Sequence, residues 1–74
     1  MKRNEPELLA MGQRVRARRH ALGWSQEKLA EGCGLHWSYI GQVERGHRNI
    51  GYLNLVRLAK ALDVSTALLV SDPP

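Results

Sequence analysis

The sequence predicts an all-α fold, a compact arrangement of five helices. Apolar residues recur at helical spacing along most of the chain, and residues that favour helix ends separate the periodic segments. No segment shows the sustained apolar–polar alternation with β-branched residues that is typical of a half-buried strand. A chain of 74 residues is the size of one small domain. We therefore expect a single domain over residues 1–74, with frayed tails at 1–6 and 71–74.

The first two helices are delimited by residues that begin and end helices. The first is expected over about 7–22, because Pro6 suits a first helical turn and Gly23 suits the position after a helix end. Its apolar stripe consists of Leu8, Met11, Val15 and Leu22. The second begins at Ser25, a good N-cap residue, and ends at Gly34.

Three further helices complete the predicted fold. They are expected over about 36–45, which ends before Gly46, over 52–62, and over 65–70. The fourth helix is expected to direct Leu53, Val56, Ala59 and Leu62 towards the core. The second and third helices are short and are joined by a three- or four-residue turn containing glycine. This is the helix-turn-helix pattern.

The charge of the chain is basic and unevenly distributed. Lys and Arg number 11 against 7 Asp and Glu, for a formal net charge of +4. The basic residues cluster in two places, Arg14, Arg16, Arg18, Arg19 and His20 in the first helix, and Arg45, His47 and Arg48 after the third. Clustered arginine indicates a polyanionic partner, although a solvated helix face gives the same pattern.

Several classes of function are not expected from this composition. The only cysteine, Cys33, has no partner for an internal disulfide or a resolving thiol, and we expect it to be buried core rather than a redox sensor. The three histidines lack metal-ligand spacing, and no nucleophile is paired with a base, so neither a metal site, a cofactor nor an enzyme is predicted. There is no membrane-length apolar run and no signal-peptide core, which favours a complete cytoplasmic protein without a membrane partner.

The segment GLHWSYIGQVERG, residues 34–46, carries more polar and aromatic side chains than a short helix needs for folding. On a helix, Ile40 and Val43 would point inward. One outward row would contain Trp37, Gly41 and Arg45, a second would contain Ser38 and Gln42, and Tyr39 would lie at the flank. A glycine facing outward would allow a large partner to approach closely.

This outward set has the chemistry of a DNA-reading face. Gln42 can bond to adenine N6 and N7, and Ser38 can bond to several base edges. Trp37 can lie against thymine methyls or a sugar, and Tyr39 offers both a ring and a hydroxyl donor. The alternatives are that Trp37 is a half-buried packing residue and that the two polar residues are ordinary surface residues.

The stretch GWSQEKLAEGCGLHWSYIGQVERG resembles the helix-turn-helix of the XRE family, the lambda-repressor-like and Cro-like regulators. The resemblance continues through RNIGYLNLVRLAKALDV and covers about residues 11–70. The tracts SYIGQVERGHRN and LNLVRLAKALD are similar to those of restriction–modification controller proteins, which are small dimeric activator–repressors. The resemblance implies a homodimer on a pseudo-palindromic operator, with the third helix in the major groove of double-stranded DNA.

The resemblance also implies roles for individual residues. The DNA-binding positions are Gln26, His36, Trp37, Ser38, Tyr39, Gln42, Arg45, Arg48 and Asn49. Arg19 and Glu44 match a buried ion pair that joins the first and third helices. The dimer interface is expected at Leu68, Leu69 and Val70, although these residues would also suit the core of one protomer.

Some positions depart from the family pattern, and Gly32 near the end of the second helix is a poor helix former there. His36 replaces the usual Ser, Thr or Asp cap of the third helix, which weakens the cap but offers a donor to phosphate. Trp37 replaces a polar or basic residue, so the operator sequence stays open.

The sequence therefore predicts a sequence-specific regulator of transcription, with no small-molecule ligand. A restriction–modification controller or a similar autoregulator is the first interpretation, and an antitoxin-type or phage-type repressor is the next. A different class, a protein-interaction module anchored by Trp37 and Tyr39, would bind its partner without DNA.

Overall fold

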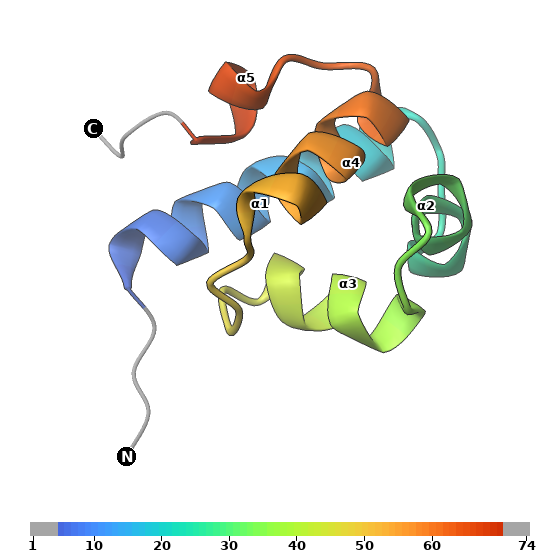
Figure 1. Cartoon of the computed structure of the whole chain (residues 1–74). Helices are drawn as coiled ribbons and strands as arrows, with labels where there is room; N and C mark the ends of the chain where they lie inside the picture. Colours follow the sequence, from blue (N-terminus) through green and yellow to red (C-terminus); the bar gives the residue numbers. More distant parts are fainter. Residues whose placement is uncertain (1–4, 71–74) are drawn as a thin grey trace.

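The computed structural model describes residues 5–70, and the secondary structure of this part is entirely helical (Figure 1). The helices are α1 (Pro6–Ala21), α2 (Gln26–Cys33), α3 (Trp37–Glu44), α4 (Tyr52–Leu62) and α5 (Thr66–Val70). The predicted fold class is confirmed, and each observed boundary lies within one residue of the predicted one. Pro6, which was assigned to the N-terminal tail, is the first residue of α1, and Glu5 is its N-cap. The remaining expected tail residues, 1–4 and 71–74, lie outside the described part.

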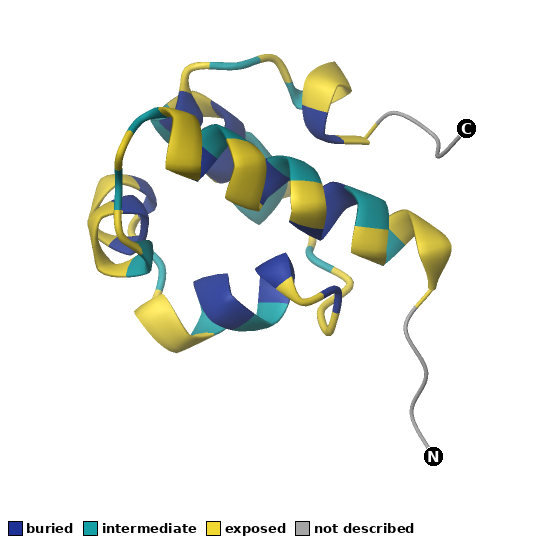
Figure 2. Ribbon diagram, turned by 180° about the vertical axis from the view of Figure 1, so that it is seen from behind, coloured by how far each residue is buried: buried dark blue, intermediate teal, exposed yellow. Residues whose placement is uncertain are grey.

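The first helix forms the centre of the fold. It contacts α3, α4 and α5, while α2 packs against α3 and α4. In Figure 1 and, from behind, in Figure 2, α3 and α5 lie on opposite sides of the α1–α4 pair. This arrangement leaves the outer side of α3 uncovered within the described chain.

The core is built from the apolar stripes of all five helices. Its fully buried side chains are Val15, Leu29, Ile40, Val43, Leu58, Leu62 and Leu69. Figure 2 shows the buried residues on the inward sides of the helices. Ile40 and Val43 are the inward residues that the sequence predicted for α3. Because they pack into the core, the opposite side of this helix faces away from it.

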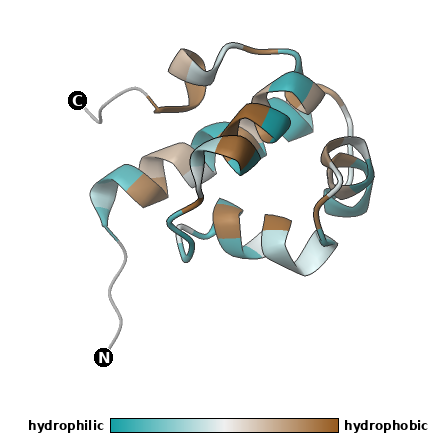
Figure 3. Cartoon of the chain, viewed as in Figure 1, coloured by the Kyte–Doolittle hydropathy of each residue, from teal (hydrophilic) through white to brown (hydrophobic). Residues whose placement is uncertain are grey.

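Ala59 and Leu62 on α4 are buried as predicted, but the N-terminal end of this helix is oriented differently from the sequence prediction. Leu53 is 66% exposed, whereas Leu58 is completely buried. A helix advances about 100° per residue, so a stripe that contains Leu55, Leu58 and Leu62 turns Leu53 away from the core. The expected inward position of Leu53 was therefore wrong. Figure 3 shows that hydrophobic residues occur along both α4 and α5.

The helices α1 and α3 cross at Gly12. A Cβ atom at this position would clash with the carbonyl oxygen of Val43 and would lie 2.7 Å from that of Glu44. Since both neighbours are backbone atoms, only glycine allows this close approach. The crossing fixes the C-terminal end of α3 against α1.

Candidate nucleic-acid interface

The turn between α2 and α3 is built by local hydrogen bonds. Ser25 caps α2, its hydroxyl oxygen accepting from the Lys28 amide at 3.0 Å. At the other end Gly34 has a φ of 73°, a left-handed conformation that favours glycine. The amides of Gly34 and Leu35 both donate to the carbonyl of Ala30, at 2.9 and 3.1 Å. The turn thus closes α2 tightly and starts α3 three residues later.

The third helix begins at an unusual cap. The ring nitrogen Nδ1 of His36 accepts a hydrogen bond from the Ser38 amide at 3.1 Å and lies 2.7 Å from the Ser38 hydroxyl. His36 therefore occupies the N-cap position and caps α3 through its ring nitrogen. The weaker cap that the sequence predicted is not observed. Its ring also stacks on Trp37, with ring centroids 5.6 Å apart. The Trp37 side chain is 52% exposed, so it is not a core residue in the protomer.

A chain of contacts connects the middle of α3 to the following loop and to α4. Arg48 Nε donates to Gln42 Oε1 at 2.6 Å, and the Arg48 guanidinium lies 5.4 Å from the centroid of the Tyr39 ring. The Tyr39 hydroxyl accepts from Asn54 Nδ2 on α4 at 3.4 Å. Tyr39 is half-buried against the core and is therefore only partly available to a partner. No feature of the sequence predicts that Asn54 contributes to this site.

Gly41 is not an open position on the outer face. It is buried, and a Cβ atom there would lie 3.3 Å from Arg45 Nη1 and 3.5 Å from Gln26 Oε1. The expectation that Gly41 leaves open space for a large partner was wrong, because the side chains of Gln26 and Arg45 lie over it. The glycine instead provides space for two residues that were themselves expected to contact DNA.

An ion pair lies beneath this surface. Arg19 Nε and Nη2 donate to Glu44 Oε2 and Oε1 at 2.6 and 2.9 Å, and both residues are buried. Gln26 Nε2 donates to the same Glu44 carboxylate at 3.2 Å. The hydrogen bond between Arg19 and Glu44 raises the pKa of the Arg19 guanidinium above its ordinary value. This is the pair implied by the family resemblance, and it connects α1, α2 and α3.

The basic clusters divide between internal and exposed positions. Arg18 Nε donates to the carbonyl of Leu62 at the end of α4, at 2.9 Å, so Arg18 as well as Arg19 serves the fold. A cation at a helix C-terminus also interacts favourably with the helix dipole. Four residues after α3 are exposed, namely Arg45, His47, Arg48 and Asn49. The exposed positive charge therefore lies beside α3 more than the sequence alone indicated.

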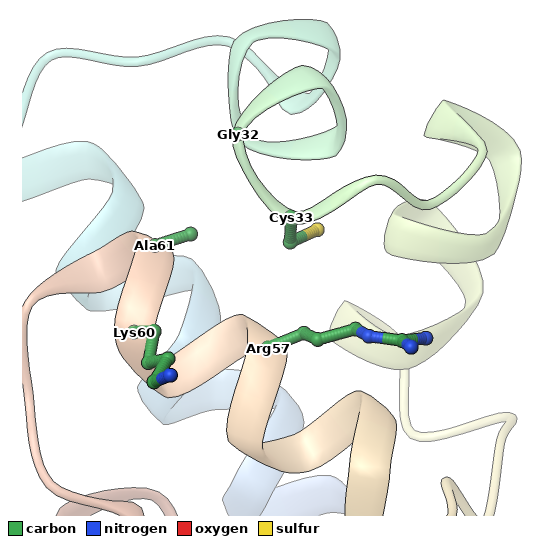
Figure 4. Close-up of a pocket in the computed structure, with 5 residues that line it drawn as sticks. All are labelled: Gly32, Cys33, Arg57, Lys60 and Ala61. Atoms are coloured by element: carbon green, nitrogen blue, oxygen red, sulfur yellow. The ribbon is translucent and has the colours of Figure 1, made fainter.

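Cys33 lies at the end of α2, where it faces a shallow cavity of about 290 Å³ lined by Gly32, Arg57, Lys60 and Ala61 (Figure 4). Its side chain is buried, and burial raises the pKa of the thiol. Sγ lies 3.7 Å from the carbonyl oxygen of Ala30. Cys33 is a core residue, as predicted.

The three residues expected at a dimer interface have different environments. Leu69 is completely buried in the core of the protomer, whereas Leu68 and Val70 are 51% and 48% exposed. Two further exposed apolar residues, Tyr52 and Leu53, lie at the start of α4. Exposed apolar side chains are therefore present on both α4 and α5, but Leu69 is not among them.

Within residues 5–70, no group of three or more histidine, cysteine, aspartate or glutamate side chains is arranged to hold a metal ion. None of the helices in this part has the length and hydropathy needed to cross a membrane.

Comparison with known proteins assigns the chain to a family. The family model described as "Helix-turn-helix" matches residues 15–69. The control protein C.SmaI of Serratia marcescens is 48% identical over 65 residues, which cover 88% of this chain and 75% of that protein. Two other curated relatives are longer, and the matching region spans 52% of each.

Solved structures give the same result. The restriction–modification controller protein C.AhdI from Aeromonas hydrophila superposes with a TM-score of 0.85 at 48% identity, over 88% of this chain and 98% of that one. The P22 c2 repressor, solved in complex with a synthetic operator, gives a TM-score of 0.80 at 36% identity, over 85% and 96% of the two chains. The chain therefore belongs to the helix-turn-helix family, in its XRE-type branch, and is similar to restriction–modification controller proteins.

Proposed function

We propose that this protein is a sequence-specific regulator of transcription that binds double-stranded DNA as a homodimer, acting as a restriction–modification controller or a similar autoregulator. The observation that carries the proposal is the uncovered face of α3. This face presents Trp37, Ser38 and Gln42 beside the exposed basic loop that follows the helix. A short helix of this kind, preceded by a tight turn and a capped helix, fits the major groove.

The reading residues and the backbone contacts are assigned to different parts of the surface. Trp37, Ser38 and Gln42 reach base edges, and Tyr39 supports them from the flank. Phosphate contacts come from Gln26, His36, Arg45 and Asn49, which surround α3. Arg48, in the loop after α3, contacts the backbone or the groove. Affinity for any DNA should therefore fall steeply as salt is raised, whereas the base preference should not.

The homodimer is proposed to form through the exposed apolar residues of α4 and α5. Beside Val70 lies a cavity of about 200 Å³ whose other walls are Glu7, Leu8, Met11, Asn49, Ile50 and Leu55. A second copy can cover Tyr52, Leu53, Leu68 and Val70 and fill this cavity with an apolar side chain. Two copies related by a two-fold axis match a pseudo-palindromic operator with half-sites about 34 Å apart.

The proposal includes no catalytic step, cofactor or small-molecule effector. Occupancy of the operator would then depend on the concentration of the protein and on dimerisation, in the cytoplasm where the DNA is found. An antitoxin-type or phage-type repressor would share this fold and surface, and the position of the operator relative to neighbouring genes would distinguish it.

The test is fluorescence anisotropy with the DNA immediately upstream of the protein's own gene. Scrambled DNA of the same length and composition, at the same salt concentration, is the control. A specific regulator should prefer the upstream DNA by about 10³-fold or more, with a cooperative isotherm. Weak and equal binding to both DNAs would contradict autoregulation.

The protein-interaction alternative is favoured by one observation, the 52% exposure of the Trp37 side chain. Aromatic residues of this kind anchor protein interfaces. That alternative predicts tight binding to a protein partner, nearly independent of salt and without DNA. Replacement of Trp37 by alanine would then abolish partner binding while leaving DNA affinity unchanged.

A further inference from the structure

We propose that Gln42 and Arg48 act as one reading unit that offers mainly hydrogen-bond donors to DNA, and that this unit selects guanine over adenine. The inference rests on the proposed function and specifies the base that one position of the operator carries. It also revises the adenine contact that the sequence suggested for Gln42.

The orientation of the Gln42 carboxamide follows from its partner. Arg48 Nε lies 2.6 Å from Gln42 Oε1, and a guanidinium group has donors and no acceptor. The atom of Gln42 that faces Arg48 must therefore be the oxygen, which fixes an amide orientation that would otherwise be ambiguous. Gln42 can then offer a base the two donors of Nε2 and only the second lone pair of Oε1.

The Arg48 guanidinium is held from a second side. It lies 5.4 Å from the centroid of the Tyr39 ring, in the geometry of a cation–π contact. Tyr39 is in turn half-buried and accepts a hydrogen bond from Asn54 on α4. Tyr39 is thus a positioning residue that acts through Arg48, and the unit is assembled in the free protein.

The donor pattern of this unit determines which base it fits. In the major groove guanine presents two acceptors, N7 and O6, whereas adenine presents the acceptor N7 and the donor N6. Nε2 of Gln42 and the remaining N–H groups of Arg48 can satisfy both acceptors of guanine while the bond between the two residues stays intact. Adenine would place its N6 amino group against a cation and a second set of donors.

Recognition of adenine by Gln42 would require Oε1 to accept from N6. Arg48 already uses that oxygen in a short, charge-assisted hydrogen bond, which is stronger than a bond between neutral groups. The second lone pair of Oε1 stays available, but adenine would have to bring its N6 amino group to this oxygen beside the Arg48 cation, so the bond disfavours adenine. Removal of Arg48 should release the oxygen and restore the ordinary preference of glutamine for adenine.

The experiment is selection of binding sites from a randomised duplex library, carried out with the wild-type protein, Gln42→Ala and Arg48→Ala. The position read by Gln42 is the base pair whose preference disappears in Gln42→Ala. At that position we expect the wild-type protein to prefer guanine over adenine by about tenfold or more, and Arg48→Ala to shift the preference towards adenine. Arg16→Ala, which removes one exposed positive charge from α1, is the matched control and should keep the guanine preference.

The possible failures are distinguishable. Adenine at the Gln42-dependent position of the wild-type site, or an Arg48→Ala variant that loses affinity for all sequences equally and keeps guanine, would overturn this inference while leaving the proposed function intact. The absence of any Gln42-dependent position would do the same. If the wild-type protein selects no sequence at all, the proposed function itself fails. Circular dichroism melts of each variant verify that it is folded.

Discussion

Arg19 and Glu44 form a two-bond ion pair that joins α1 to the C-terminal end of α3, with donor–acceptor distances of 2.6 and 2.9 Å. The third donor of Arg19, Nη1, reaches the carbonyl oxygen of Trp24 at 2.8 Å. Gln26 adds a bond from α2 to the same carboxylate. One buried charge pair therefore connects the two helices of the helix-turn-helix to each other and to α1.

Removal of one partner of this pair should be strongly destabilising. We expect Glu44→Ala to lower the free energy of unfolding by about 3–5 kcal/mol, because Arg19 would remain as a buried charge without its carboxylate. A guanidinium group stays charged at any ordinary pH, so Arg19 cannot relieve this cost by losing its proton. Urea unfolding followed by circular dichroism measures the change.

The control for this prediction is a double variant. Arg19→Met combined with Glu44→Leu removes both charges and keeps apolar volume, so it should recover a large part of the stability lost in Glu44→Ala. If the single variant unfolds within about 1 kcal/mol of the wild-type protein, the pair does not connect the helices as its geometry indicates.

Two glycines in helices should respond to alanine with opposite signs. Gly12→Ala places a methyl group against backbone carbonyls of α3, which cannot move without separating the helices. We expect a loss of about 1–3 kcal/mol, as for other overpacked cores. Gly32→Ala adds a methyl group 3.7 Å from the Ala61 Cβ, an ordinary contact, and should gain up to about 1 kcal/mol of helix propensity. Thermal melts of both variants, made in parallel, would contradict this account if their midpoints shifted in the same direction.

The difference between these two glycines explains which parts of the fold can be predicted from sequence. Helix ends depend on local chemistry, so Ser25 and Gly34 predicted the turn between α2 and α3 correctly. The direction in which a helix faces depends on its neighbours, and Leu53 was misplaced because two apolar stripes on α4 are compatible with the same sequence. Gly12 gave no sequence signal, because the backbone of α3 that it contacts is about thirty residues away along the chain.

The same reasoning applies to the candidate interface. Trp37, Ser38 and Gln42 lie on the outer side of α3 because Ile40 and Val43 define the inner side, and this periodicity is visible in the sequence. Their hydrogen-bond partners are not visible there. The contact between Gln42 and Arg48 depends on the path of the loop after α3, and the role of His36 as a cap depends on the orientation of its ring.

The apolar surface of α4 and α5 gives a test of the oligomeric state. We expect Leu53→Glu combined with Leu68→Glu to convert a dimer to a monomer, because both side chains are more than half exposed and their charges would be buried in the interface. Sedimentation equilibrium measures the mass, and an unchanged thermal midpoint at high dilution shows that the protomer stays folded. Leu69→Ala is a poor alternative, since Leu69 is in the core and its loss would unfold the protomer.

A dimer that persists in the double variant would place the interface elsewhere. A monomeric wild-type protein at micromolar concentration would contradict the proposed assembly more directly. In either case the half-site spacing of about 34 Å would lose its structural basis.

The buried thiol of Cys33 should make stability depend on pH in the alkaline range. Burial raises the pKa of Cys33 in the folded protein above the ordinary thiol value of 9.0. As pH rises past that value the unfolded chain loses its thiol proton first, so the folded state is increasingly disfavoured. The stabilisation is fully present below pH 9.0 and is lost as pH rises through the folded pKa.

The comparison that isolates this effect is between the wild-type protein and Cys33→Ala, with urea unfolding at pH 7, 9 and 10. Titration of lysine and tyrosine affects both proteins equally, so the difference between their free energies of unfolding reports the thiol. We expect the wild-type protein to lose its higher free energy of unfolding relative to Cys33→Ala as pH rises, and a pH-independent difference would show that the Cys33 thiol is not desolvated.

At pH 7 the thiol of the native protein should also react with iodoacetamide far more slowly than that of the urea-unfolded chain, because Cys33 is only 7% exposed and its thiolate is disfavoured.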